Sequence, residues 1–151
     1  MTETASMTTS ARETGIASAP PRSASYGAAG PRAGMRRLLR LEGAAAFAAA
    51  VALYAHGGFS WLLFAAMFLA PDLSMLAYLA GPRSGAAGYN AAHAYVLPLP
   101  LLAAGFVTGA PALTAGALIW IAHIGFDRAL GYGLKYPTGF GDTHLGRIGR
   151  R

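Results

Sequence analysis

The sequence predicts an all-α integral membrane protein built as a bundle of four transmembrane helices. The first observation is composition: the 151 residues are 54% hydrophobic and only 12% charged, whereas about a quarter of the residues are charged in a typical soluble domain. The mean hydropathy is accordingly positive, at +0.40. The second observation is that the apolar residues gather in four long runs, and the third is that most basic residues lie at the ends of these runs.

The first part of the chain, residues 1–34, consists mainly of Ser, Thr, Ala, Pro and Gly. Such a segment cannot bury enough apolar surface to offset the entropy lost on ordering. We therefore expect a disordered cytoplasmic tail over 1–34, followed by a transmembrane domain over 36–150. The first apolar run starts near Leu38, too far along the chain for an ordinary cleavable signal peptide.

Four apolar runs follow the tail, and we expect a helix over each. They cover residues 38–56, 58–80, 86–109 and 111–133. A helix of about 20 residues crosses a bilayer, and the first run, which is rich in Ala, is the weakest candidate. The linkers are short enough to be tight turns between antiparallel neighbours. Residues 134–151 form a Gly-rich basic segment that is too polar to span.

The positions of the basic residues predict the orientation in the membrane. With four crossings, both termini and the turn "GPRSG" lie on one side, and so does every Arg and Lys beside the helices. The positive-inside rule makes that side the cytoplasm. We therefore expect a multi-pass protein of the inner (plasma) membrane, with the lipid bilayer as its partner.

The same charge placement excludes some functions. The net charge is +6, but no long basic face with interleaved aromatic residues exists, which argues against nucleic-acid binding. The absence of cysteine excludes disulfides, thiolate metal sites and a cysteine nucleophile.

Polar side chains interrupt three of the four runs. They are Asp72 in the second, Asn90 and His93 in the third, and His123, Asp127 and Arg128 in the fourth. Counted inward from Arg83 or Lys135, the carboxyl, amide and imidazole groups among them lie about 10–18 Å deep. Asn90 and His93 share one helical face, as do His123 and Asp127. Ionisable groups are costly in hydrocarbon, so we expect them to meet inside the bundle as one ligand-binding site.

Two further features lie near this layer. Pro71, Pro98 and Pro100 each remove a helical hydrogen bond, and broken helices at membrane depth occur where they line a cavity or are covered by protein. Arg128 points about 100° around the helix from Asp127, where it could pair with Asp72 or Glu42.

In the last segment, Asp142 and His144 have two interpretations that the sequence leaves open. They form a lid over the cytoplasmic mouth of the site, or they belong to a basic tail held by anionic lipids.

Three strings carry a family resemblance: "MFLAPDLSMLAYLAGPR", "YNAAHAYVLP" and "IAHIGFDRALGYGLKYPTGFGDTHLGRIG". Together they resemble the small bacterial membrane proteins of domain-of-unknown-function family 4260, from about Arg36 to Arg150. The resemblance implies a compact multi-pass membrane protein and supplies no catalytic role for any residue.

The residues themselves favour binding of a divalent metal ion or a small ligand. His93, His123, Asp72 and Asp127 are competent ligands for zinc or a similar ion. Three alternatives stay open: a metal-dependent intramembrane hydrolase that uses the spare carboxylate as a base, a solute or proton transport site that requires a homo-oligomer, and a structural subunit whose ion-paired layer specifies helix packing. No specific metal motif such as HExxH is present, so the sequence leaves open whether the site catalyses a reaction.

Overall fold

The computed structural model describes residues 33–148, which are mainly helical, as the composition predicts. The elements in chain order are the helices α1 (Ala33–His56) and α2 (Trp61–Met67), the 3-10 helix η1 (Ala70–Ala80), the helices α3 (Pro82–Ala92), α4 (Pro98–Thr108) and α5 (Pro111–Leu130), and the strands β1 (Asp142–Thr143) and β2 (Gly146–Arg147). The expected disordered tail over 1–34 lies outside the described residues, except for Ala33 and Gly34. These two residues form the start of α1, so the helix begins earlier than predicted.

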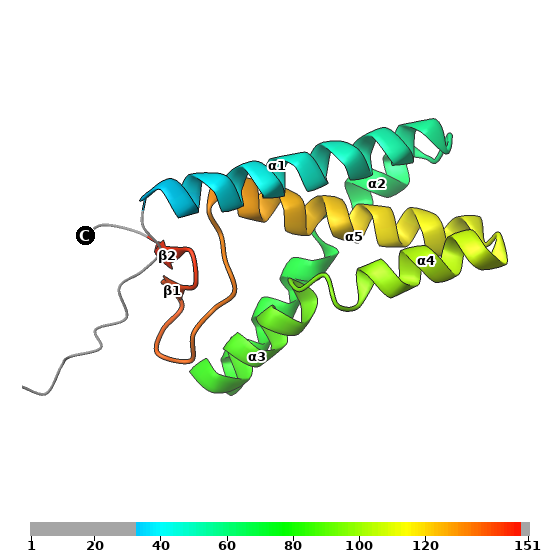
Figure 1. The fold of residues 1–151 in the computed structure, drawn as a ribbon. Coiled ribbons are helices and arrows are strands. Elements are labelled where there is room, and N and C mark those ends of the chain that lie inside the picture. Colours follow the sequence, from blue (N-terminus) through cyan, green and yellow to red (C-terminus); the bar gives the residue numbers. More distant parts are fainter. Residues whose placement is uncertain (1–32, 149–151) are drawn as a thin grey trace, which may run out of the picture.

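Helix α5 is the centre of the fold and lies between α1 and α4 (Figure 1). Half of its residues are buried, among them Leu118, Ala122 and Ile124. Glycines bring α1 and α5 into close contact: a Cβ atom on Gly125 would lie 2.7 Å from the backbone nitrogen of Phe47. The sequence places small residues where the two backbones touch, as membrane helices commonly do.

The second expected helix, over 58–80, is present as two helical pieces. Ser60 caps the first piece, α2, by accepting a hydrogen bond from the backbone nitrogen of Leu63 at 3.3 Å. The chain then turns into the 3-10 helix η1, where the backbone nitrogen of Asp72 donates to the Leu69 carbonyl, three residues back. Pro71 explains the change, because it has no N–H and cannot continue the α-helical ladder.

The third expected helix, over 86–109, is wrong as a single element. Its first part belongs to α3, which already starts at Pro82, so most of the "GPRSG" segment is helix and only Gly81 (φ 105°) makes the turn. The helix stops at His93 and resumes as α4 at Pro98. Pro98 and Pro100 lack the N–H groups that would bond the carbonyls of the preceding turn, which accounts for the interruption.

The last described residues fold back onto the helices. Helix α5 ends at Leu130, three residues before the predicted end, because Gly131 adopts a left-handed conformation with φ 100° and caps it. Strands β1 and β2 then pair as a small antiparallel hairpin, and an isolated bridge joins Lys135 to Thr143. The hairpin lies beside the start of α1 (Figure 1).

The outer surface of the molecule is strongly apolar. Within residues 33–148, two helical runs are long and apolar enough to cross a membrane, Ala33–His56 and Trp61–Ala80. None of the second run's apolar window is buried inside the protein, and Leu79 is 89% exposed. On α4, Val107 is 87% exposed. Large apolar side chains therefore point away from the core along several helices.

Candidate metal centre

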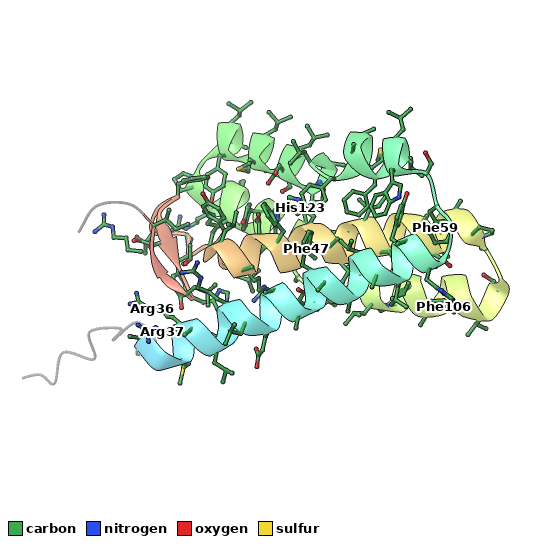
Figure 2. All side chains as sticks on the ribbon, turned by 90° about the horizontal axis from the view of Figure 1, so that it is seen from above. Arg36, Arg37, Phe47, Phe59, Phe106 and His123 are labelled. Carbon is green, nitrogen blue, oxygen red and sulfur yellow. The ribbon has the colours of Figure 1, made fainter. Side chains whose placement is uncertain are left out.

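Four polar side chains from three helical segments meet at one point in the molecule. Asp72 comes from the first turn of η1, directly after Pro71. His93 caps the end of α3 at the break before α4. His123 and Asp127 lie one turn apart on α5. Figure 2 shows His123 in the interior, where these segments come together.

Five distances between the ligand atoms lie around those expected for a tetrahedral metal ion. The His93 and His123 Nε2 atoms are 3.1 Å apart. Oδ1 of Asp72 lies 3.5 Å from the first imidazole and 3.6 Å from the second. Oδ2 of Asp127 lies 3.6 and 3.9 Å from the same two atoms. Zinc bonds of about 2.0–2.2 Å in a tetrahedron give ligand-to-ligand distances of about 3.3–3.6 Å.

These contacts do not form an ordinary network of hydrogen bonds. Of the five distances between imidazole and partner atoms, only the one between His93 and His123 is short enough for a hydrogen bond. The four ligand atoms nevertheless all lie within 4.8 Å of one another. Groups that paired directly would approach to about 2.8 Å, whereas groups that share a central cation stay further apart.

The orientation of His93 is fixed by its own helix. Its Nδ1 lies 2.8 Å from the Tyr89 carbonyl oxygen, which can only accept, so Nδ1 carries the proton and donates. In the neutral ring, Nε2 then carries a lone pair, which faces His123 Nε2 at 3.1 Å. A ligating histidine typically donates its other ring nitrogen to a carbonyl or carboxylate in this way.

Tyr89 also supports the second carboxylate. Its hydroxyl donates to Oδ2 of Asp127 at 3.0 Å, and its ring stacks on the imidazole of His93 at 3.7 Å between centroids. Phe68 packs its ring edge-on against His123, with 5.4 Å between centroids. Aromatic side chains thus pack against both histidines. The spacing of four residues between Tyr89 and His93 puts the two rings on one helical face, and this contact could have been predicted from the sequence.

The cluster is buried on the histidine side and open on the aspartate side. The side chains of His93 and His123 are 3% and 2% exposed, against 16% for Asp127 and 30% for Asp72. Asp72 is therefore the most exposed member of the cluster. Among residues 33–148, His123 Nδ1 has no hydrogen-bond partner.

Two residues predicted for the site, Asn90 and Arg128, bond backbone groups near it. The side-chain amide of Asn90 bonds the backbone of Lys135 twice: Nδ2 donates to the carbonyl at 2.9 Å, and Oδ1 accepts from the amide nitrogen at 2.6 Å. Asn90 therefore holds the C-terminal segment and is not in the cluster. The reason is geometric, since it lies one turn before His93 and points toward the end of α5.

Arg128 is not paired with a carboxylate within the described part of the chain, so the predicted pairing with Asp72 or Glu42 is wrong. Its guanidinium instead lies 3.3 Å from the His93 carbonyl and 3.3 Å from His144 Nε2. The break after α3 explains this, because it leaves carbonyl oxygens without helical partners that a cation can satisfy.

His144 and Lys135 anchor the last segment close to the cluster. His144 Nδ1 accepts from the backbone nitrogen of Leu134 at 2.8 Å. Burial, and then the nearby Arg128 guanidinium, lower the pKa of His144 below its ordinary value. The ammonium of Lys135 lies 3.9 Å from the centroid of the Phe140 ring, and burial lowers the pKa of this group as well. The sequence indicates a role for His144, but it does not indicate that Lys135 is buried.

A comparison with protein families adds the identity of this region. A family model described as "Domain of unknown function (DUF4260)" matches residues 36–148. The chain belongs to the DUF4260 family. The match covers all four residues of the cluster and the C-terminal hairpin, and it leaves out the N-terminal tail. No curated protein and no solved structure matches this DUF4260 chain.

Proposed function

We propose that this DUF4260 protein is a multi-pass membrane protein that binds one divalent transition-metal ion through Asp72, His93, His123 and Asp127. The convergence of four ligand atoms within 4.8 Å carries the proposal. Two imidazoles with two carboxylates suit zinc and its neighbours, whereas calcium and magnesium prefer oxygen ligands throughout. The geometry favours this function over a purely structural polar layer, because only one of the five contacts is short enough to be a hydrogen bond.

The apolar surface supports the membrane part of the proposal. Exposed apolar patches on soluble monomers are rarely larger than a few hundred Å². In this protein, exposed Leu and Val side chains lie along α2, η1 and α4. The α1–α2 and α4–α5 connections lie at one end of the molecule, and the C-terminal hairpin lies at the other (Figure 1). We place the hairpin end at the cytoplasm, because the positive-inside rule puts the basic residues on that side. The polar cluster then opens toward the cytoplasm.

A metal-dependent intramembrane hydrolase is the second candidate, and the exposure of Asp72 favours it. If His93, His123 and Asp127 held the metal, Asp72 could leave the ion and act as a general base for a bound water. An Asp72→Asn variant tests this mechanism with fluorogenic ester and phosphodiester substrates in mixed micelles. The mechanism predicts hydrolysis by the zinc-loaded protein and a loss of at least about 100-fold in the variant at unchanged metal content. Equal rates in the two proteins would exclude Asp72 as the base.

The central test of the proposal is metal stoichiometry. Detergent-purified protein is loaded with zinc, dialysed and analysed for metal by mass spectrometry. We expect about one ion per chain in the wild type and none in a His93→Ala, His123→Ala double variant. His56→Ala is the matched control, because His56 lies exposed at the far end of α1. Circular dichroism checks that each variant is folded, and equal metal in the double variant and the control would refute the site.

A further inference from the structure

A second polar feature lies at the hairpin end of the molecule, apart from the His/Asp cluster. It is an open cavity of about 470 Å³ between the start of α1, the end of α5 and the strand β2. This volume is in the range of small-ligand sites. Among residues 33–148, four arginines line it, namely Arg36, Arg37, Arg40 and Arg147, and no lining residue in this range carries a carboxylate. We call this feature the arginine cavity.

The arginines on α1 lie together because of their spacing. Arg36 and Arg40 are one helical turn apart, and Arg37 follows Arg36. Figure 2 shows Arg36 and Arg37 at the first turns of α1, beside the C-terminal hairpin. Ala33, the first residue of α1, lines the same cavity, and the N-terminal end of a helix carries partial positive charge.

Within residues 33–148, not all of this positive charge is paired with a carboxylate. Arg40 is held by the end of α5, where its Nε donates to the Ala129 carbonyl at 2.8 Å. Arg147 Nε lies 3.5 Å from Asp142 Oδ1, but the Arg147 side chain is 79% exposed, so the pair is weak. Within residues 33–148, no carboxylate lies within 4 Å of Arg36 or Arg37. Among the described residues, the guanidinium groups of Arg36 and Arg37 thus have no carboxylate partner.

The hairpin turn is shaped around one of these groups. Gly146 has φ 116°, and a Cβ atom there would lie 3.2 Å from Nη1 of Arg36. The start of β2 therefore leaves little room for a side chain beside the Arg36 guanidinium. Leu130 and Tyr132 also line the arginine cavity. Tyr132 lies as well beside a small void that His93 and Asp127 line.

From these observations we infer that the arginine cavity is a binding site for a phosphomonoester anion. Arginine recognises phosphate through pairs of parallel N–H donors, and several guanidinium groups around one cavity suit a dianion. The site lies at a helix end where the proposed membrane orientation puts lipid headgroups, so the phosphate belongs either to an anionic lipid or to a soluble molecule. Binding here does not depend on a metal in the His/Asp cluster.

The test is a calorimetric titration of detergent-purified protein with three probes. Dihexanoyl phosphatidic acid offers a phosphomonoester on a lipid, dihexanoyl phosphatidylcholine has the same chains with a zwitterionic headgroup, and inorganic phosphate lacks the lipid. We expect phosphatidic acid to bind and phosphatidylcholine to bind much more weakly or not at all. Binding of inorganic phosphate with similar affinity would assign the site to soluble phosphates, and its absence would assign it to lipids; either result supports an anion site.

Variants decide whether the arginine cavity is responsible. An Arg36→Gln, Arg37→Gln variant should bind the anion at least about tenfold more weakly. Arg83→Gln is the matched control, because Arg83 is an exposed residue of α3 that does not line the cavity. If neither anion binds the wild type, or if the double variant binds as tightly as the control, the inference is wrong and the arginines serve membrane orientation alone.

Discussion

The Nε2 atoms of His93 and His123 face each other at 3.1 Å, although the two residues are 30 positions apart in the chain. This contact joins the broken end of α3 to the central helix α5. It places two buried imidazoles beside two carboxylates, of which Asp72 is the more exposed. The arrangement has consequences that can be tested outside the cluster itself.

Tyr89 should contribute to metal affinity without being a ligand. A Tyr89→Phe variant keeps the ring stacked on His93 and removes only the hydrogen bond to Asp127. Loss of such a supporting bond typically weakens metal binding by about 10–100-fold. Competition with a chromophoric chelator measures the change. Tyr95→Phe is the control, because the Tyr95 hydroxyl has no partner among the described residues; equal affinities of the two variants would contradict the role of Tyr89.

Asn90 should affect the C-terminal segment and leave the metal in place. An Asn90→Leu variant keeps the side-chain size but removes both bonds to the Lys135 backbone, at a cost of about 1–3 kcal/mol for the buried amide. Trypsin should then cleave after Lys135 faster than in the wild type, because this buried residue becomes accessible. Metal content should stay at one ion per chain. A variant that loses its metal would show that Asn90 belongs to the site after all.

The contact between α1 and α5 should be sensitive to a single methyl group. A Gly125→Ala substitution puts a Cβ atom 2.7 Å from the Phe47 backbone, so the helices must separate. We expect a loss of about 1–3 kcal/mol in stability and a lower melting temperature in detergent. Gly116 lies on the same helix with open space beside it, so Gly116→Ala should be neutral or stabilising by up to about 1 kcal/mol. Similar melting temperatures for the two variants would mean that the close contact is absent.

Acid should loosen the C-terminal segment. Burial and Arg128 lower the pKa of His144, so the folded protein binds fewer protons than the unfolded chain near the ordinary imidazole pKa of about 6.5. The contribution of a neutral His144 is therefore complete above this pH and declines as the pH falls below it. Hydrogen exchange over 134–148, corrected for intrinsic rates, should show less protection at pH 5.5 than at pH 7.5. In a His144→Gln variant this dependence should disappear, and an unchanged dependence would assign it to another group.

The proposed membrane orientation can be tested with single cysteines, because the chain has none of its own. Ser60 lies exposed between α1 and α2, and Ser84 lies exposed in the first turn of α3. In intact cells a membrane-impermeant maleimide should label Ser60→Cys, whereas Ser84→Cys should react only after lysis. The reverse pattern would invert the orientation. Labelling of both positions in intact cells would rule out the proposed topology.

The polar layer could be predicted because depth and helical facing follow from counting. Asp72, His93, His123 and Asp127 fall at similar distances from the basic ends of their segments, and the cost of isolated charges in an apolar environment favours their meeting. The same reasoning placed Asn90 at the site and offered Asp72 or Glu42 as a partner for Arg128. In the structure, Asn90 bonds the Lys135 backbone and Arg128 lies against the His93 carbonyl. Side-chain partners depend on rotation about each helix axis, which counting along the chain does not give.

The sequence by itself determined the helical class and the family, because composition, spacing and short motifs are local properties. It indicated a polar layer, and the tertiary structure brought Asp72, His93, His123 and Asp127 together in it. Only the tertiary structure decided that Arg128 lies against the His93 carbonyl at the break after α3. It also decided that Lys135 is buried under an aromatic ring and that the first turns of α1 share a cavity with the hairpin. These features depend on contacts between segments far apart in the chain. The sequence allows several partners for each side chain, and the packing of the segments decides which partner it meets.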